Sequence, residues 1–205
     1  MTADAEASLA IDLLKRAKTG DRGAFGKLVV LFQDRLFNAT LRMVGDRDEA
    51  AELTQETFTK ALAGLESFRG ESGPYTWFFR IAVNLSISRL RKVQRHRVFS
   101  LDRPSSSNGQ NGRHEDQASA LIDRVRQSAP GPSARLEQRE RAEQVVAALG
   151  RVEPEYRAVL IMRDVEGFDY QQMADVLGMP LGTLKSRLFR ARIALRDELK
   201  SYMAK

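Results

Sequence analysis

The stretch DYQQMADVLGMPLGTLKSRLFRARIALRDEL, residues Asp169–Leu199, decides the fold of the C-terminal part of the chain. From Tyr170 onward apolar residues recur at helical spacing, and Asp169 stands where an N-cap carboxylate accepts hydrogen bonds from free backbone N–H groups. Gly178 suits the left-handed conformation that closes a helix, and Pro180 suits the first turn of the next helix. The pattern therefore predicts a short helix, a tight turn and a second, longer helix.

The second of these helices has an apolar stripe and many cations. The stripe consists of residues at helical spacing, namely Leu184, Leu188, Ala191, Leu195 and Leu199. The cations fall outside the stripe, at Lys185, Arg187, Arg190, Arg192 and Arg196. A helix-turn-helix whose second helix presents small polar and cationic side chains is typical of proteins that read duplex DNA in the major groove. The alternative is an ordinary core helix with a solvated basic face.

Composition limits the classes of function. The net charge of +6 suits a polyanionic partner. The chain has no cysteine, and its two histidines, His96 and His114, cannot build a zinc site alone, so no metal or cofactor is expected. No stretch is long and apolar enough to span a membrane, and the N-terminus lacks the basic segment of a secretory signal. We therefore expect a soluble, cytoplasmic protein.

Two stretches of helical pattern are separated by a stretch of different composition. Helical spacing fills residues 9–97 and resumes near residue 137. Between them, residues 98–136 are rich in Ser, Gly, Asn and Pro, as flexible linkers are. The sequence predicts an all-α fold of two small helical domains, residues 1–97 and 137–205, joined by this flexible linker, with the helix-turn-helix in the C-terminal domain.

Glycine, proline and aspartate mark further helix ends. In a glycine–aspartate pair, the glycine ends one helix and the aspartate caps the next. Glu49 stands three residues after Asp46, as in a capping box. A proline suits the first turn of a helix. The helix boundaries expected on these grounds are Gly20–Asp21, Gly45–Asp46, Pro74, Pro154 and Gly167.

Aromatic and cationic residues gather near the end of the first domain. The segment ESFRGESGPY contains Arg69 and Tyr75, and the helix that follows is strongly basic. Such side chains together can hold unstacked bases, each stack being worth ~1–3 kcal/mol, while Lys and Arg balance the phosphates. For Trp77, Phe78 and Phe79, core packing is an equal alternative. Arg69 and Tyr75 are therefore the better candidates for contact with nucleic acid.

The predicted helix after Asp46 is acidic. The acids in its first turn are accounted for by capping and the helix dipole. Glu52, Gln55 and Glu56 lie beyond the first turn, with Leu53 beside them. This group suits a docking surface for a basic partner helix, and the alternative is a solvated face.

Enzyme chemistry finds no support in the sequence. A nucleic-acid enzyme needs paired carboxylates in a pocket, a phosphate-cradling loop or an activated nucleophile. The chain has no Walker-type glycine loop and no cysteine or histidine cluster. We therefore predict that the protein is not an enzyme and has no catalytic residues.

Three segments strongly resemble one protein family. They read DEAAELTQETFTKAL, FRGESGPYTWFFRIAVNLSISRLRK and VLIMRDVEGFDYQQMADVLGMPLGTLKSRLFRARIALR, in this order. The family is the bacterial RNA polymerase sigma factors of the extracytoplasmic-function (ECF) group, in the sigma-70 superfamily. The resemblance covers nearly everything outside the linker. It implies a subunit that binds core polymerase, recognises promoter DNA and assists promoter melting.

The resemblance also implies roles for particular residues. The polymerase clamp would be bound through Glu52, Leu53, Gln55 and Glu56. The melted minus-ten element, with its flipped base, would be bound by Arg69, Ser72, Tyr75, Trp77, Arg80, Asn84 and Arg89. The minus-thirty-five element would be read in the major groove by Pro180, Thr183, Lys185, Ser186, Arg187 and Arg190.

Further partners follow from the same resemblance. The second domain would contact the polymerase flap, and the linker would run toward the RNA exit channel. Members of the family are commonly held inactive by an anti-sigma protein, so a partner of that kind is expected. The competing interpretation is a stand-alone dimeric helix-turn-helix regulator that binds palindromic duplex DNA without polymerase. The sequence leaves open whether the two domains pack together in the free protein.

Overall fold

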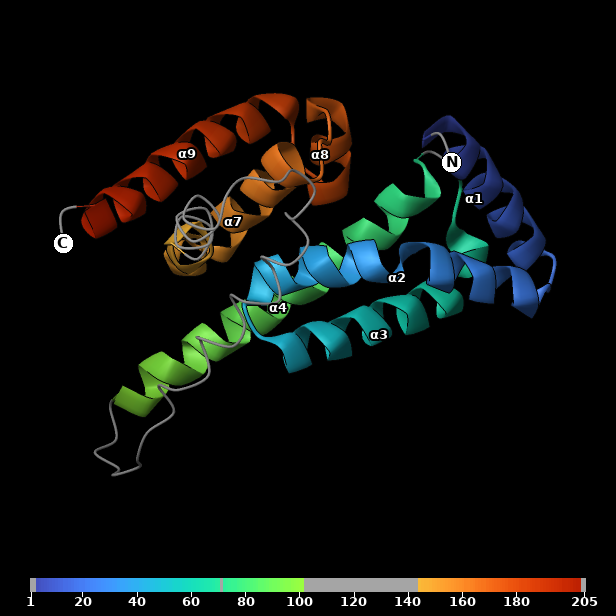
Figure 1. Cartoon of the computed structure of the whole chain (residues 1–205), viewed down its shortest axis with the longest axis horizontal. Helices are drawn as coiled ribbons and strands as arrows, with labels where there is room; N and C mark the ends of the chain where they lie inside the picture. The colour runs from blue at the N-terminus through green and yellow to red at the C-terminus, as the bar shows by residue number, and fades with distance from the viewer. Residues whose placement is uncertain (1–2, 71, 102–143, 204–205) are drawn as a thin grey trace, which may run out of the picture.

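The computed structural model describes residues 3–70, 72–101 and 144–203, and every regular element in these ranges is a helix (Figure 1). The predicted all-α fold with two helical domains is therefore confirmed. Within the same ranges, no helix combines the length and the apolar character that crossing a bilayer requires.

The first domain is built from α1 (Ala3–Lys18), α2 (Arg22–Val44), α3 (Arg47–Ala63) and α4 (Pro74–Leu101), with a 3-10 turn at Leu65–Ser67. Helix α2 is central, because it packs on α1, α3 and α4 (Figure 1). The core between these helices contains the fully buried side chains of Leu28 and Leu36. Phe32 of α2 packs against Phe78 of α4, with ring centroids 5.8 Å apart.

Local capping accounts for the boundaries of α2 and α3. Asp21 and Asp46 are the N-caps, and each carboxylate accepts a hydrogen bond from a backbone N–H of the first helical turn. Gly45 ends α2 in the left-handed conformation, at a φ of 79°. Of the predicted capping box of α3, the N–H of Glu49 donates to the carboxylate of Asp46 at 2.9 Å, and the carboxylate of Glu49 lies 3.7 Å from Arg89.

The first domain extends past its predicted end. Helix α4 runs without interruption from Pro74 to Leu101, so residues 98–101 are helical rather than part of a flexible linker. These residues read VFSL, and they include no glycine or proline that would stop a helix. The rest of the predicted linker, residues 102–136, lies outside the described residues.

The second domain contains a helix over residues 144–151, then α7 (Pro154–Leu160), a π-helical turn η2 (Ile161–Val165), α8 (Tyr170–Leu177) and α9 (Leu181–Met203). Helices α8 and α9 form the predicted helix-turn-helix. Asp169 caps α8 by accepting from the N–H of Gln172 at 2.8 Å, and the Gln172 side chain accepts from the N–H of Asp169 at 3.0 Å. Gly178 closes α8 at a φ of 62°, as predicted.

The π-helical turn shapes the connection between α7 and α8. At its end the N–H of Glu166 donates to the carbonyl of Ile161 at 2.9 Å. Gly167 then redirects the chain at a φ of 73°, and the N–H of Phe168 donates to the carbonyl of Met162 at 2.9 Å. This geometry carries the side chains of Glu166 and Phe168 to the first domain.

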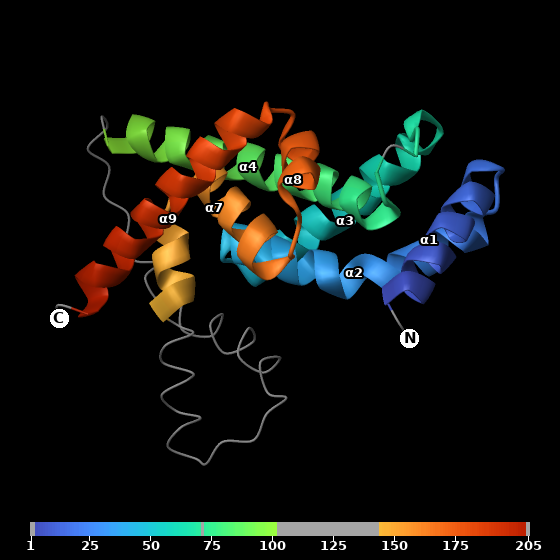
Figure 2. The same ribbon diagram turned by 90° about the horizontal axis from the view of Figure 1, so that it is seen from above.

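The two domains pack against each other. Helices α7 and α8 lie against α4, and η2 lies against α2 (Figure 1, Figure 2). The second domain therefore covers one side of the first domain, while α1 lies at the opposite end of the molecule from the C-terminus of α9 (Figure 2). This arrangement settles the question that the sequence left open.

Candidate nucleic-acid interface

The first turns of α9 present a polar and cationic surface. Beneath it, the first part of the apolar stripe is buried, with Leu184, Leu188 and Ala191 exposing at most 3% of their surface, whereas Leu195 and Leu199 are half-buried. Of the residues predicted to read duplex DNA, Arg187 is half-buried, and the others are exposed, namely Pro180, Thr183, Lys185, Ser186 and Arg190. The structure thus brings the predicted residues together on one accessible surface.

The start of α9 leaves room for close approach by a phosphate. A Cβ atom added at Gly182 would meet nothing within 4 Å. The hydroxyl of Ser186 donates back to the carbonyl of Gly182 at 3.1 Å, so this side chain lies along the first turn. Because the N-terminal turn of a helix has free N–H groups and a positive dipole end, this turn suits a DNA backbone contact.

One apolar residue on this surface, Phe189, is not among the residues predicted to contact DNA, although helical spacing places it on the side away from the apolar stripe. Phe189 is 68% exposed, although it is the neighbour of the buried Leu188. On a helix that enters the major groove, an exposed aromatic ring can contact the methyl group of thymine. The available signal was its position on the side away from the apolar stripe, where a phenylalanine has no core to join.

Arg192 and Lys185 of α9 contact groups within their own domain. Arg192 donates to the carboxylate of Asp164 at 2.8 Å. The ammonium of Lys185 lies 6.0 Å from the ring centroid of Tyr170, but Lys185 is still exposed. Arg192 is therefore partly neutralised, whereas Lys185 remains available to DNA.

Most aromatic residues at the start of α4 belong to the core of the first domain. Phe78 and Phe79 expose 0% and 1% of their surface, so core packing is the correct alternative for both. Trp77 is half-buried, and its ring lies 5.0 Å from that of Phe68 and 5.1 Å from that of Phe78. Trp77 therefore combines core contacts with a partly exposed surface that nucleic acid can reach.

The other residues that are predicted to bind the minus-ten element differ in their exposure to solvent. Arg69 and Asn84 are exposed, and Ser72 is half-buried. Arg80 is also half-buried, and within the described part of the chain its buried Nε atom has no hydrogen-bond partner. An unpaired guanidinium N–H is costly to bury, so Arg80 would gain from an acceptor such as a phosphate oxygen.

Tyr75 occupies a different environment from the one expected. It lies in the first turn of α4, and its hydroxyl donates to Glu166 of the second domain at 2.8 Å. The guanidinium of Arg35 lies 3.8 Å from the centre of its ring. Burial and the negative charge of Glu166 raise the pKa of Tyr75. The expectation of a tyrosine presented by an open loop is therefore wrong for this arrangement of the domains.

Acidic and basic side chains neutralise each other between α3 and α4. Arg89 lies 3.7 Å from Glu49 and 3.6 Å from Glu52. A DNA contact by Arg89 would therefore compete with these two carboxylates.

The described ranges contain no group of histidine and acidic side chains that could hold a metal ion.

The acidic docking surface on α3 is smaller than the sequence predicted. Glu52 and Gln55 are exposed, and Glu56 is half-buried and pairs with Lys60 at 3.2 Å. Leu53 was predicted to join them, but it is only 1% exposed and belongs to the core. It lies on the apolar side of α3, so no partner can touch its side chain directly.

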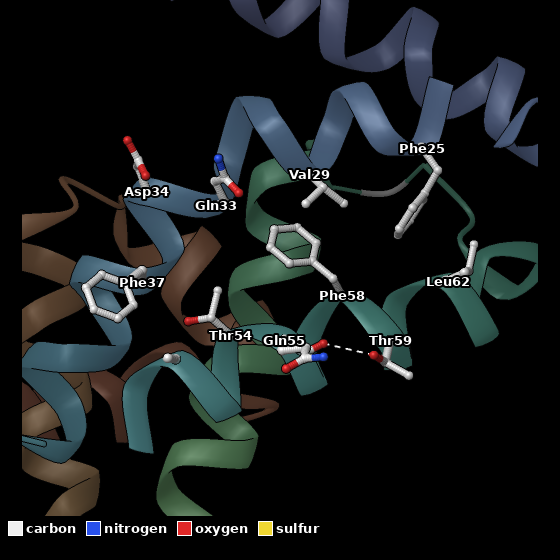
Figure 3. A pocket seen from close by; sticks show the side chains of 11 residues that line it. Phe25, Val29, Gln33, Asp34, Phe37, Thr54, Gln55, Phe58, Thr59 and Leu62 are labelled. Carbon is white, nitrogen blue, oxygen red and sulfur yellow. Dashed lines mark hydrogen bonds between the residues drawn. The ribbon is translucent and has the colours of Figure 1, made fainter. Parts of the chain in front are cut away.

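An apolar groove of about 510 Å³ lies beside this surface, between α2 and α3 (Figure 3). Its apolar lining includes Phe25, Val29, Phe37, Phe58 and Leu62. Polar side chains, among them Gln33, Asp34 and Gln55, also line it. The sequence does not predict this apolar lining, because the lining forms only when two helices are placed side by side.

Comparison with known proteins links both domains to one family. The model described as Sigma-70 region 2 matches residues 28–96, and the model described as Sigma-70, region 4 matches residues 142–195. The RNA polymerase sigma-H factor of Pseudomonas aeruginosa is 34% identical over 188 residues, which cover 92% of this chain and 92% of that protein. The ECF RNA polymerase sigma-E factor of Escherichia coli K12 is 31% identical over 189 residues, covering 92% and 93%.

Solved structures agree with this result. The sigma factor RpoE from Bartonella quintana, in complex with the anti-sigma factor NepR, is 25% identical, with a TM-score of 0.59 over 86% of this chain and 96% of that chain. CnrH, in complex with the cytosolic domain of CnrY, is 22% identical, with a TM-score of 0.62 over 94% of this chain and 98% of that chain. The second likeness concerns the fold alone.

Proposed function

Because this chain belongs to the ECF group of the sigma-70 family and is an RNA polymerase sigma factor, we propose that its two domains divide promoter recognition between them. In this proposal the first domain, which ends with α4 at Leu101, binds the polymerase clamp and the minus-ten element. The second domain, residues 137–205, reads the minus-thirty-five element and contacts the polymerase flap. Residues 102–136 connect them.

The clamp contact is assigned to the exposed part of α3 and the groove beside it. Glu52, Gln55 and Glu56 supply acidic and polar groups, and the groove supplies apolar surface. A helix with a row of apolar side chains and flanking cations would fit both features, since amphipathic helices bind in apolar grooves. Leu62, which is 51% exposed at the groove, is the best candidate for an apolar anchor.

The minus-ten contact is assigned to the start of α4 and the loop before it. Tyr75 and Trp77 supply aromatic surface for an extruded base, and Arg69, Arg80 and Arg89 supply cations for the strand. Ser72 and Asn84 add hydrogen-bonding groups nearby. Base flipping costs a few kcal/mol, which stacking and phosphate contacts can offset.

The minus-thirty-five contact is assigned to the first turns of α9. Lys185, Arg187 and Arg190 are placed to read base edges or hold phosphates, with Pro180, Thr183 and Ser186 beside them. Phe189 adds an apolar contact for thymine. The exposed cationic start of α9, combined in one chain with an aromatic and cationic start of α4, is the observation that carries this proposal.

The chain's own side chains contribute no catalysis in this proposal, and no cofactor is required. The protein acts in the cytoplasm, where polymerase and chromosome are found. A neighbour of similar fold was solved with an anti-sigma factor, which supports an inhibitor of that class as a further partner. A stand-alone dimeric regulator is not favoured, because such a protein has no use for the groove and acids of α3.

Transcription in vitro tests the proposal. Core RNA polymerase and fragmented genomic DNA of the source bacterium are incubated with and without the chain, and the 5′ ends of the transcripts are sequenced. The expected result is a set of start sites that requires the chain and shares two sequence elements at a fixed separation. Identical start sites with and without the chain would refute the proposal, whereas footprints of the chain alone on palindromes would favour the stand-alone regulator.

A further inference from the structure

One hydrogen bond ties the end of α1 to the segment before α4. The ammonium of Lys18, in the last turn of α1, donates to the backbone carbonyl of Phe68 at 2.7 Å. The two residues are 50 positions apart in the sequence, and α1 packs on the 3-10 turn that ends just before Phe68 (Figure 1). Because the donor is charged, this hydrogen bond is stronger than one between neutral groups.

The end of α1 is itself fixed to α2. The guanidinium of Arg16 donates to the carboxylate of Asp21 at 2.8 Å, and the same carboxylate caps α2 by accepting from the N–H of Ala24 at 3.0 Å. The hydroxyl of Thr19 donates to the carbonyl of Arg16 at 2.8 Å. These contacts join the last turn of α1 to the first turn of α2, so Lys18 extends from a fixed point of the first domain.

Phe68 is also held by α4. Its ring lies 5.0 Å from the ring of Trp77, and its backbone is extended, at a φ of −65° and a ψ of 117°. The carbonyl accepts from Lys18 while the ring packs on Trp77, so Phe68 is fixed by two groups from different helices. The chain that leaves Phe68 toward α4 therefore starts from a defined position and direction.

The loop that follows is the one assigned to the minus-ten element. Arg69 is exposed at its start, and Gly70 turns the chain at a φ of 79°. At the far end the N–H of Trp77 donates to the carbonyl of Gly73 at 3.1 Å. Both ends of the loop are therefore attached to helices, to α1 at one end and to α4 at the other. A loop whose ends are fixed loses less conformational entropy when it binds a partner.

We propose that Lys18 is a positioning residue for minus-ten recognition: its ammonium fixes the start of the loop that presents Arg69, and Lys18 itself does not contact DNA. The proposal rests on the proposed function, because that function assigns this loop to the minus-ten element. It gives α1, which carries none of the residues predicted to bind DNA, a part in promoter melting. Loss of the Lys18 ammonium should weaken melting and leave the reading of the minus-thirty-five element by α9 unchanged.

The anchoring of the loop can be tested on the free chain, without polymerase. Trp77 is the sole tryptophan of the sequence, and its ring lies against Phe68, so its fluorescence reports on this packing. Lys18→Ala should release Phe68, which shifts the emission of Trp77 to longer wavelength and makes acrylamide quenching stronger. Lys18→Arg keeps a charged donor and should restore the emission of the unsubstituted chain.

Lys15→Ala is the matched control. Lys15 is exposed in the same last turn of α1, so its replacement removes an equal charge from the same helix end. The emission of Trp77 in this variant should equal that of the unsubstituted chain, and circular dichroism checks that all variants keep their helix content. Equal emission and equal quenching in Lys18→Ala and Lys15→Ala would overturn the proposal.

Promoter melting by the holoenzyme gives the functional readout. Each variant is combined with core polymerase on a promoter found in the transcription experiment, with 2-aminopurine in the minus-ten element. Lys18→Ala should lower the equilibrium constant for melting by about threefold to tenfold, as expected for the loss of one hydrogen bond that orders the loop. The affinity for a duplex carrying only the minus-thirty-five element should stay the same. Lys18→Arg should restore melting.

Two further measurements separate positioning from direct contact. If Lys18 acts through the loop, the variant Lys18→Ala/Arg69→Ala should lose less than the sum of the two single effects, whereas additive losses would show that Lys18 acts independently. The salt dependence of binding should be equal with and without Lys18→Ala. A shallower dependence would mark a phosphate contact by Lys18 itself and overturn the positioning role.

The same assays distinguish failure of this proposal from failure of the proposed function. Melting that depends on Arg69 but not on Lys18 would overturn the positioning role alone. If Trp77 responds to Lys18→Ala while neither Lys18→Ala nor Arg69→Ala changes melting, the assignment of the loop to the minus-ten element is wrong, and the positioning role falls with it.

Discussion

Arg157 of the second domain donates a hydrogen bond to the carbonyl oxygen of Met43, which lies in the last turn of α2 in the first domain. The same guanidinium donates to the carbonyls of Gly150 and Val152 at 2.6 and 3.1 Å. Burial lowers the pKa of Arg157 to about 10, so the group is still charged at neutral pH. A cation at the C-terminus of α2 also interacts favourably with the helix dipole.

Replacing Arg157 by methionine is expected to lower the free energy of unfolding by about 3 kcal/mol, because three carbonyl groups lose a charged donor. Arg157→Lys keeps the charge but cannot reach all three carbonyls, so its loss should be smaller. Urea unfolding followed by circular dichroism measures both. Equal stability of the methionine variant and the unsubstituted chain would contradict this role.

Glu49 provides a test of pH dependence. Burial raises the pKa of its carboxyl above the ordinary value of 4.5, against the opposing charge of Arg89. Between the ordinary pKa of Glu49 in the unfolded chain and its raised pKa in the folded chain, the folded chain binds more protons. The contribution of Glu49 to the free energy of unfolding therefore falls as pH rises through this window. Glu49→Gln removes that fall. The melting temperature of the variant, relative to the unsubstituted chain, should therefore rise as the pH is raised from 4.5.

The groove of α2 and α3 can be tested at its exposed edge. Leu62→Asp places a charge beside the apolar lining and is expected to weaken core polymerase binding by about tenfold, or ~1.4 kcal/mol. Val30→Asp is the control, since Val30 is 71% exposed on α2 and does not line the groove. Fluorescence anisotropy with labelled chain measures both affinities. Equal losses for the two variants would show that the groove is not the binding site.

Gln55 and Glu56 allow an independent test of the same contact. Replacing both by alanine should reduce core affinity while the melting temperature stays nearly unchanged, because Gln55 is exposed and the ion pair of Glu56 with Lys60 lies at the surface. Unaltered core affinity would remove these residues from the docking surface.

Arg187 distinguishes base reading from phosphate contact. If its side chain reads a guanine, Arg187→Ala should weaken holoenzyme binding to the upstream element by ~1–3 kcal/mol and relax the preference at one position. If it holds a phosphate, the loss should be equal on all sequences, with a shallower salt dependence. Arg196→Ala is the control, because Arg196 pairs with Asp197 farther along α9. Binding titrations at several salt concentrations decide between the two.

The turn between α8 and α9 depends on a left-handed residue. Gly178→Ala is expected to cost ~1 kcal/mol, because alanine is strained in the left-handed conformation. Crowding does not contribute to this cost, because a Cβ there would meet nothing within 4 Å. Gly182→Ala, in the first turn of α9, should be neutral or slightly stabilising. Thermal unfolding of the two variants separates backbone conformation from crowding, and equal effects would contradict the assignment.

Local chemistry made most of the helices predictable. Helix α8 begins after the carboxylate cap of Asp169 and ends at the left-handed turn of Gly178, and both features depend only on neighbouring residues. The buried stripe of α9 follows from helical spacing alone. The composition predicts too early an end for α4, because residues 98–101 stand next to the Ser- and Gly-rich segment and yet can continue a helix.

Contacts between distant segments were not predictable from the sequence. Tyr75 and Glu166 are separated by 91 residues, and nothing near either residue identifies the other as its partner. Leu53 was assigned to a surface because of its acidic neighbours, yet side-chain direction on α3 turns it into the core. Predicting the groove requires the relative placement of α2 and α3, and the periodicity of a single helix gives no information about that placement.

Helix α4 carries both Tyr75 and Arg91 on one uninterrupted rod, and these residues lie roughly 24 Å apart along its axis at ~1.5 Å per residue. No break interrupts the helix between these points, so a displacement of one point along the helix axis also moves the other. The contacts that the second domain makes near Tyr75 and near Arg91 should consequently be lost together when the domains separate.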